Sequence, residues 1–277
     1  MSFRTSYTDG LRRFLAKGLR GVARRIDTAN TWAFLDARQA ELGNVPPLDI
    51  SAVIAAYFGA KGQCQIVQVG ANSGNRNDPV EASIRNLGLT AILVEPQAEE
   101  FAKLTANYAD QPQVVLERAA IAWETGEVEL FKVNADFWSG HGFPEGAQSQ
   151  ISSLNREQIG QTVEIFGGSK LREAESAYLE IEVVPAFPLE MLLEKHGLGT
   201  IDLLVIDTEG FDFEILRMID WDRLQPAMIH YETIHLAIPE RVAAWTMLCE
   251  KGYRLFATDN HNTIAINVTK RTVNARG

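Results

Sequence analysis

The feature that most constrains this chain is a short apolar run followed at once by a glycine-containing loop. Residues 66–69 read Ile-Val-Gln-Val, and residues 70–74 read Gly-Ala-Asn-Ser-Gly. A short apolar run bounded by a turn is typical of a strand buried inside a sheet. Gly70 lets the backbone turn sharply and lets a ligand approach where a Cβ atom would clash. The run therefore predicts a buried strand with a binding loop at its carboxyl end.

Beyond residue 64 the chain alternates between short apolar runs and amphipathic stretches, which predicts strands alternating with helices. The expected strands are 65–69, 91–94, 114–118, 128–133, 181–184, 201–206, 228–231, 253–257 and 263–267. The expected helices are 98–108, 189–196, 212–219 and 240–251, with one more that begins near Asp78-Pro79. Such alternation implies right-handed crossovers and a mainly parallel sheet with helices on both faces. Ligands of these α/β folds bind outside the carboxyl ends of the strands.

Two segments depart from this alternation. Residues 1–60 are predicted to form a helical extension, which is broken at Pro46-Pro47 because proline cannot continue a helix. Residues 61–277 are predicted to form one α/β domain. Within it, glycines with Asn, Ser and Gln between them predict a loop-rich insertion over 134–178. A loop of that length usually carries a binding or covering function, so we expect it to close over the ligand.

The charge of the chain is divided unevenly. Of a formal net charge of −10, residues 1–25 carry +6, which leaves −16 on the rest. Nucleic-acid backbones are bound by clustered Lys and Arg, so a body this acidic argues against a nucleic acid as partner. Up to residue 26, the basic residues lie mostly between apolar positions that recur at helical spacing. Such a helix would either pack on the domain or a neighbouring subunit, or rest on an anionic membrane surface.

Neither a membrane span nor a secretory signal is expected. No apolar run approaches the roughly 18–20 residues that cross a bilayer, and no apolar stretch follows the basic N-terminus. Cys64 and Cys249 lie far apart without ligand-like spacing, which predicts thiols in a reducing compartment. We therefore expect a cytoplasmic protein, with peripheral contact to the inner face of the membrane through residues 1–26 as an open alternative.

The glycine loop and a carboxylate after the next strand suit a nucleoside ligand. Asn72 stands where the dinucleotide fingerprint G-x-G-x-x-G requires its second glycine, so the loop is poorly suited to a pyrophosphate. Glu95 follows the strand 91–94, and the 25 residues that separate it from Gly70 leave room for one helix. A carboxylate at this place can accept both hydroxyls of a ribose. The alternative is that Glu95 only caps the following helix.

Four further side chains that can take part in catalysis follow two later strands: Asp207, Glu209, Glu232 and His235. The carboxylates can hold an amino group, orient a hydroxyl or bind a metal, and the alternative for this region is helix capping by Thr208 or Asp212. His235 has an ordinary pKa suited to a general base near neutral pH, or it is a structural histidine. A zinc-protease site is excluded, because HExxH requires a helix and the spacing here is HxExxH at a strand end.

Taken in order, these segments resemble the FkbM family of methyltransferases. The resemblance lies in VQVGANSGNRNDP (67–79), AILVEP (91–96), IDLLVIDTEGFDFEIL (201–216) and IHYE (229–232), and it covers roughly residues 64–267. It implies a Rossmann-like class I methyltransferase sheet, mostly parallel with an antiparallel last strand. It also implies S-adenosyl-L-methionine as the cofactor, and methyl transfer to a hydroxyl, commonly on a sugar, glycan or polyketide.

The resemblance also implies roles for single residues, carried over by position. Gly70, Ala71 and Asn72 would line the cofactor loop, Glu95 would bind the ribose hydroxyls, Ala120 would lie near the adenine, and Asp207 would lie beside the methionine end and the reaction centre. In this reading 61–277 is the methyltransferase domain and 134–178 covers the methyl acceptor. One departure is Gln68, because many methyltransferases have an acidic residue before the first glycine. A charged contact to the cofactor at this position is therefore in doubt.

Methyl transfer from a sulfonium requires alignment of donor and acceptor and removal of the hydroxyl proton. Asp207, Glu209, Glu232 and His235 are the candidate bases. The interpretation that we favour contains no metal, although carboxylates after two strands permit a divalent ion with oxygen ligands. Two other functions stay open at this point. One is a nucleotide-dependent oxidoreductase on a similar sheet, disfavoured by Asn72, and the other is a non-catalytic module recruited to a membrane by the basic N-terminal helix.

Overall fold

The computed structural model describes residues 48–75, 78–143, 151–259 and 261–269. Most of the predicted N-terminal extension, with its basic helix, lies outside these ranges, so both stay predictions. The predicted boundary at residue 60 falls inside the helix α3 (Ile50–Lys61), whose Ile54 packs into the core of the central sheet. Within the described ranges, no helix has the length and apolar character needed to span a bilayer.

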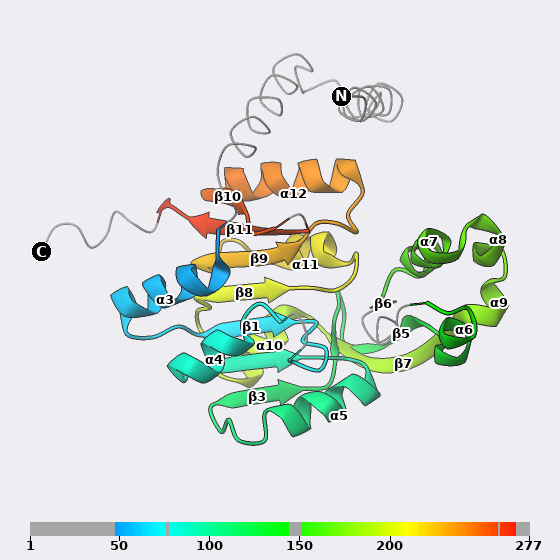
Figure 1. Ribbon diagram of the computed structural model, residues 1–277. Coiled ribbons are helices and arrows are strands. Elements are labelled where there is room, and N and C mark those ends of the chain that lie inside the picture. Colours follow the sequence, from blue (N-terminus) through cyan, green and yellow to red (C-terminus); the bar gives the residue numbers. More distant parts are fainter. Residues whose placement is uncertain (1–47, 76–77, 144–150, 260, 270–277) are drawn as a thin grey trace, which may run out of the picture.

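The centre of the molecule is a seven-stranded sheet with the strand order β10-β11-β9-β8-β1-β2-β3 (Figure 1). Its strands are β1 (Ile66–Val69), β2 (Ala91–Val94), β3 (Val114–Glu117), β8 (Leu203–Ile206), β9 (Met228–Glu232), β10 (Tyr253–Ala257) and β11 (Asn262–Asn267). Neighbouring strands are parallel except where β11 pairs with β9 and β10. The predicted sheet, mostly parallel with an antiparallel last strand, is confirmed.

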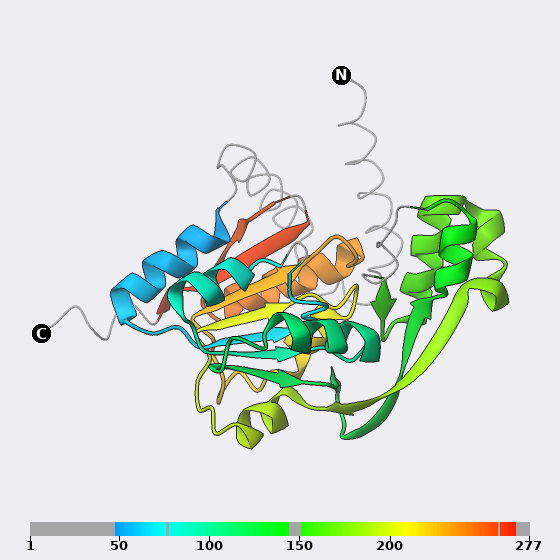
Figure 2. The ribbon, with the colours of Figure 1, turned by 60° about the horizontal axis from the view of Figure 1, so that its bottom comes forward.

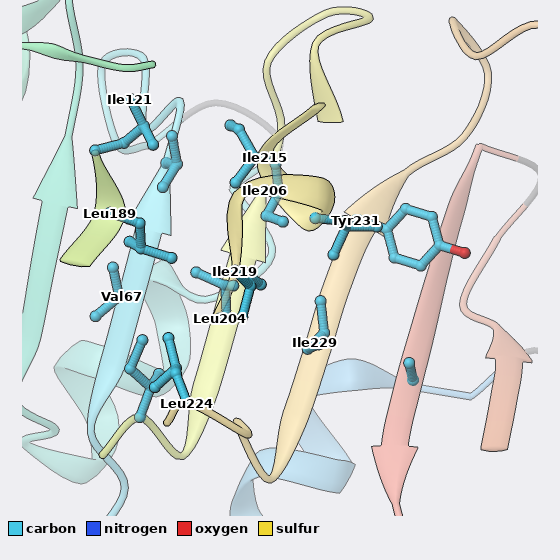
Figure 3. Close-up of a cluster of buried hydrophobic side chains, with 14 of the residues drawn as sticks. Val67, Ile121, Leu189, Leu204, Ile206, Ile215, Ile219, Leu224, Ile229 and Tyr231 are labelled. Atoms are coloured by element: carbon cyan, nitrogen blue, oxygen red, sulfur yellow. The ribbon is translucent and has the colours of Figure 1, made fainter. Parts of the chain in front are cut away.

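Helices cover both faces of this sheet, and each face has its own apolar core. One face carries α3, α4 (Glu81–Leu87) and α5 (Ala98–Asn107), and the other carries α10 (Leu189–Lys195), α11 (Asp212–Met218) and α12 (Ile238–Glu250). In the second core, Val67, Leu204 and Ile229 come from three neighbouring strands (Figure 3). Because β1, β2 and β8 are buried along their whole length, their sequences are almost continuously apolar.

The three central strands end level with one another. Val69 is paired with Val94 on one side and with Ile206 on the other, and each is the last residue of its strand. Residues 70, 95 and 207 therefore begin three loops that lie side by side at the carboxyl edge of the sheet. This shared edge is the place where parallel sheets bind their ligands.

A second, four-stranded sheet has the order β4-β7-β5-β6, with β4 (Ala120–Ile121), β5 (Gly126–Val133), β6 (Ser152–Ser153) and β7 (Leu179–Phe187). β5 and β7 pair antiparallel along their length and form what we call the arm. The arm carries the head, made of α6 (Ala135–Gly140), α7 (Arg156–Gly167), α8 (Ser169–Arg172) and α9 (Glu175–Tyr178). Figures 1 and 2 show the head beyond the edge toward which the arrows of β1, β8 and β9 point.

The head corrects the prediction that 134–178 is loop-rich, since its described residues contain four helices. The prediction was wrong because the glycines there mostly border helices. Gly167 and Gly168 end α7, and Gly160 lies inside it where the Tyr178 hydroxyl would be 3.4 Å from an added Cβ atom. The head also has an apolar core of its own, whose fully buried members include Trp138 and Ile159. A segment with its own core forms regular structure instead of a loop.

The helix expected near Asp78-Pro79 begins two residues later, at Glu81. Asp78 Oδ1 accepts hydrogen bonds of 2.8 Å from the backbone N–H groups of Val80 and Glu81. Asp78 therefore satisfies the first donors of α4 from a position before the helix, as a capping side chain does. The sequence correctly pointed to Asp78 as a side chain that accepts from the start of the helix, but it placed the N-cap and the first helical residue wrongly, since the N-cap is Val80.

The loops after β1 and β8 approach each other more closely than any side chain would allow. Gly70 has a φ of +83°, in the left-handed region. An ideal Cβ atom on Gly70 would lie 1.7 Å from the backbone oxygen of Asp207. Glycine is therefore required at position 70 both by its backbone conformation and by the space available.

We expect Gly70→Ala to lower the free energy of unfolding by at least about 2 kcal/mol, because it combines a left-handed φ with a backbone clash. Gly59→Ala is the matched control. Gly59 lies inside α3 with nothing within 4 Å of an added Cβ atom, so alanine there should stabilise the helix by about 0.5–1 kcal/mol. Urea denaturation followed by circular dichroism measures both changes. Equal stability of the two variants would contradict the close approach.

Candidate functional site

A cavity lies at the carboxyl edge of the sheet, where the loops after β1, β2 and β8 meet. Its wall contains all six predicted cofactor residues: Gly70, Ala71, Asn72, Glu95, Ala120 and Asp207. The second sheet contributes Leu130 of β5 and residues 152–154, and the loop after β8 adds Glu209 and Phe211. The structure therefore brings residues that lie far apart in the sequence around one hollow.

The loop after β1 is held against the end of β2 by its backbone. The N–H groups of Gly70 and Ala71 both donate to the Val94 carbonyl oxygen, at 2.9 and 3.0 Å. Asn72 has a φ of +48°, which asparagine tolerates better than most residues. Its side-chain oxygen accepts a hydrogen bond of 2.7 Å from the Ser73 N–H. Asn72 thus fixes a tight turn whose main chain faces the cavity.

Glu95 is buried in the cavity wall, with 3% of its surface exposed. Its Oε2 accepts a 2.8 Å hydrogen bond from the Asn72 N–H, and its Oε1 accepts one of 2.8 Å from the Gln97 N–H. Burial raises the pKa of Glu95 to about 7, although these two backbone donors oppose the rise. Each oxygen keeps a lone pair, so Glu95 can accept two hydroxyls as well as fixing the backbone around it.

Gln68 and Asp78 form a polar pair behind the loop that the sequence prediction did not connect. Gln68 Nε2 donates a 3.1 Å hydrogen bond to Asp78 Oδ2, and both residues line the cavity. Among the described residues, Gln68 Oε1 is buried and has no hydrogen-bond partner. The acidic group that position 68 lacks is thus supplied from residue 78. The only sequence signal for Asp78 was the helix-capping pattern before α4.

Part of the cavity wall is apolar. Ala119, Ala120 and Ile121 are all buried, and they line the wall together with Leu130. Small side chains beside a branched one leave a shallow surface against which a flat ring can pack. The observed surroundings of Ala120 suit its predicted place near the adenine, and the role itself stays a prediction.

Several carboxylates lie close to one another in the loop after β8. Burial and the neighbouring carboxylates of Glu209 and Asp212 raise the pKa of Asp207 well above its usual range. Asp212 is structural, because its carboxylate accepts hydrogen bonds from the Thr208 hydroxyl at 2.9 Å and the Glu232 N–H at 3.2 Å. The sequence alternative of helix capping by Thr208 or Asp212 is wrong, because the N-cap of α11 is Phe211 and no side chain caps it. It does not account for Asp207 either.

Glu209, Glu232 and His235 are brought together although they lie on two different loops. His235 Nε2 is 2.8 Å from Glu209 Oε2 and 3.7 Å from Glu232 Oε2. Glu209 has a φ of +53°, an uncommon conformation for a non-glycine residue. Burial first, and then the nearby Glu209 and Asp207, raise the pKa of Glu232 to about 10. Asp207 and Glu209 thus line the cavity, and Glu232 and His235 lie beside Glu209 without being part of the cavity lining.

The head reaches this end of the site through Gln158 of α7. Gln158 Nε2 lies 2.6 Å from His235 Nδ1, and an added Cβ atom on Gly210 would be 3.3 Å from the Gln158 side chain. Gln158 is 5% exposed. Sequence reasoning missed Gln158 because nothing in the local pattern distinguishes it from any polar residue of an amphipathic helix.

Comparison with known proteins gives a family. A model of the methyltransferase FkbM domain matches residues 68–255. Solved structures are matched only remotely. An O-methyltransferase from Bacillus cereus, in complex with SAH, has 9% identity and a TM-score of 0.39, and the match covers 93% of this chain and 97% of that one. Precorrin-6y C5,15-methyltransferase from Geobacter metallireducens has 15% identity and a TM-score of 0.37, and the match covers 78% of this chain and 85% of that one. No curated protein sequence matches this chain.

The family model covers more than half of the chain, including the loops that carry Asn72, Glu95, Asp207 and Glu232. It decides against the oxidoreductase alternative, which Asn72 had already disfavoured. The chain belongs to the methyltransferase FkbM domain family and is an S-adenosylmethionine-dependent methyltransferase with a Rossmann-like class I sheet.

Proposed function

We propose that this enzyme is an O-methyltransferase, which methylates a hydroxyl of a sugar, glycan or other natural-product acceptor. The observation that supports the proposal is the cluster of Glu209, Glu232 and His235, which adjoins the cavity where Asp207 and Glu209 line it. An alcohol hydroxyl keeps its proton at neutral pH, so its methylation needs a nearby group that takes the proton. A cluster of carboxylates with one imidazole is suited to that task.

The residues of the cavity fit S-adenosylmethionine by charge. Asp78, Glu95, Asp207 and Glu209 line the cavity, and no described Lys or Arg does. S-adenosylmethionine carries positive charge on its sulfur and its amino group, and an acidic wall stabilises both. The buried, unpartnered Gln68 Oε1 is an acceptor for the amino group. In this proposal Glu95 binds the ribose hydroxyls and Ala120 packs near the adenine.

The bound cofactor supplies a methyl group that leaves sulfur without its bonding electrons. The acceptor oxygen forms the new C–O bond as the C–S bond breaks, the electron pair stays on sulfur, and the hydroxyl proton passes to the cluster. The chain has to align the two reactants and receive that proton. Glu209 is suited to connect the cavity with His235, because it lines the cavity and its Oε2 lies 2.8 Å from His235 Nε2.

The head and β6 are proposed to cover the acceptor. Ser152, Ser153 and Leu154 line the cavity together with the loop after β8. Two hydroxyls beside one apolar side chain suit a ligand that presents both hydroxyl groups and ring carbons, as sugars do. This supports an acceptor rich in hydroxyls over a purely apolar one.

The test of the proposed function is a screen of the purified full-length protein with S-adenosylmethionine. Sugars, glycans and polyketide alcohols are compared with amines and thiols of similar size. Release of S-adenosylhomocysteine and a mass gain of one methylene unit, located on oxygen by NMR, are expected only with hydroxyl acceptors. Methylation of amines alone, with none of the alcohols, would refute O-methylation and leave the family assignment in place.

Glu95→Gln is expected to weaken S-adenosylmethionine binding at least about tenfold, or about 1.4 kcal/mol. The amide offers one acceptor oxygen in place of two, and its NH₂ group faces a backbone donor that Glu95 now satisfies. Isothermal titration calorimetry measures the Kd. Glu127→Gln, on the exposed side of β5, is the matched control and should bind like the unmodified chain. Identical Kd values in the two variants would remove Glu95 from the cofactor site.

The affinity for S-adenosylmethionine is expected to rise with pH between 6 and 8. The pKa of Glu95 is about 7, and hydroxyl donors prefer the ionised carboxylate, which is the minor form at pH 6 and the major form at pH 8. The gain is limited to about tenfold by this change in ionised fraction. Asp78 and Asp207 also line the cavity with raised pKa values, so the profile of Glu95→Gln is subtracted. A profile equally steep in the variant would assign the effect to those other groups.

A further inference from the structure

The cluster around His235 has the donor set and the spacing of a metal site. One ligand atom each from Glu209, Glu232 and His235 lies within 4.8 Å of the others. We propose that these three side chains bind a divalent first-row transition-metal ion, such as Mn²⁺ or Zn²⁺, which holds the acceptor hydroxyl. The inference rests on the proposed function and adds to it the means by which the hydroxyl is activated.

Glu232 provides an observation that points to a missing ligand. Its side chain is 12% exposed, and its Oε2 is buried with no hydrogen-bond partner among the described residues. A buried carboxylate oxygen without a donor is costly, and native proteins rarely leave one unsatisfied. His235 Nε2, at 3.7 Å, is too far to satisfy it. A cation bound between Glu232 and His235 would satisfy Glu232 Oε2.

The charges around the cluster are not balanced by the protein. Within the described part of the chain, no ion pair joins a Lys or Arg to Asp207, Glu209, Asp212 or Glu232. Carboxylates elsewhere are compensated, as Glu182 is by Lys132 at 2.9 Å. The positive charge of S-adenosylmethionine would offset Asp207, beside which its methionine end is expected. A divalent ion would offset Glu209, which lines the cavity, and Glu232, which does not.

His235 is held in the orientation that a metal ligand needs. Its Nδ1 lies 2.6 Å from the side-chain amide of Gln158, and its Nε2 faces the two glutamates. Metal-binding histidines commonly fix the ring through the second nitrogen in this way. The oxygen and nitrogen of an amide are interchangeable by a half-turn, which lets Gln158 accept a hydrogen bond from Nδ1–H. The lone pair of Nε2 is then directed toward the cation.

The donor set indicates which metal fits. Two carboxylates and one imidazole suit Mn²⁺ or Zn²⁺ better than Mg²⁺, which prefers oxygen ligands and water. Three protein ligands leave coordination positions for the acceptor. A hydroxyl bound there loses its proton more readily, and Asp207, which lies outside the three ligands, receives it. The alkoxide oxygen then forms the C–O bond, and the C–S electron pair leaves with sulfur.

Mn²⁺ binding to the full-length protein, stripped with a chelator and desalted, tests the site without turnover. Electron paramagnetic resonance of unbound Mn²⁺ should give one saturable site per chain. Glu232→Gln and His235→Gln should each raise its Kd at least tenfold, and Glu127→Gln should leave it unchanged. Absence of a saturable site in the unmodified chain, or equal Kd values in all four proteins, would overturn the proposal.

Two parallel measurements distinguish loss of the metal site from loss of the fold, and failure of the metal proposal from failure of the proposed function. The thermal midpoint and the Kd for S-adenosylmethionine in the absence of metal should stay the same in Glu232→Gln, which shows that a lost site is not a lost fold. Chelator should abolish methyl transfer to a hydroxyl acceptor, and Mn²⁺ should restore it. Full turnover in chelator would refute the metal while the proposed function stands. A Mn²⁺ site in a protein that methylates only amines would refute the proposed function and leave the cation site.

Discussion

The site depends on one contact between two backbones, at Gly70 and Asp207. The loops after β1 and β8 touch where a single Cβ atom would come within 1.7 Å of a carbonyl oxygen. The level ends of β1, β2 and β8 make this approach geometrically necessary, because their last residues are paired in register. The contact sets the loop after β1 directly against the backbone of Asp207, while the Asn72 N–H of the same loop binds Glu95.

The central sheet could be predicted because its strands are buried on both faces, and such strands appear in the sequence as short apolar runs. Glu95, Asp207 and Glu232 were predictable for the same reason, since they stand where those runs stop. The head was not predictable. Gly160 inside α7 and the glycines after it obscured an amphipathic helix, and the contact between Gln158 and His235 joins residues 77 positions apart. Only tertiary packing determines such a pair.

Burial competes with charge throughout the site, and burial prevails at five carboxyl groups. Asp78, Glu95, Asp207, Asp212 and Glu232 all have raised pKa values, with desolvation as the largest cause in each case. Backbone N–H groups moderate the rise at Glu95 and Asp212. Asp207 and Glu232 receive no such help, and their like-charged neighbours raise their pKa values further. The site is therefore prepared for positively charged ligands, whose arrival would stabilise the ionised carboxylates.

The head has an apolar core of its own, around Trp138 and Ile159, separate from the two cores of the central sheet. Substitutions within that core alter how the head is shaped without changing the packing behind the cofactor loop. Under the proposal that the head covers the acceptor, the stability of the catalytic sheet and the choice of acceptor are encoded in different residues. On the same proposal, a lineage of such enzymes would exchange one substrate for another by remodelling residues 134–178, while the residues proposed to bind the cofactor remain under a separate and unchanged selection.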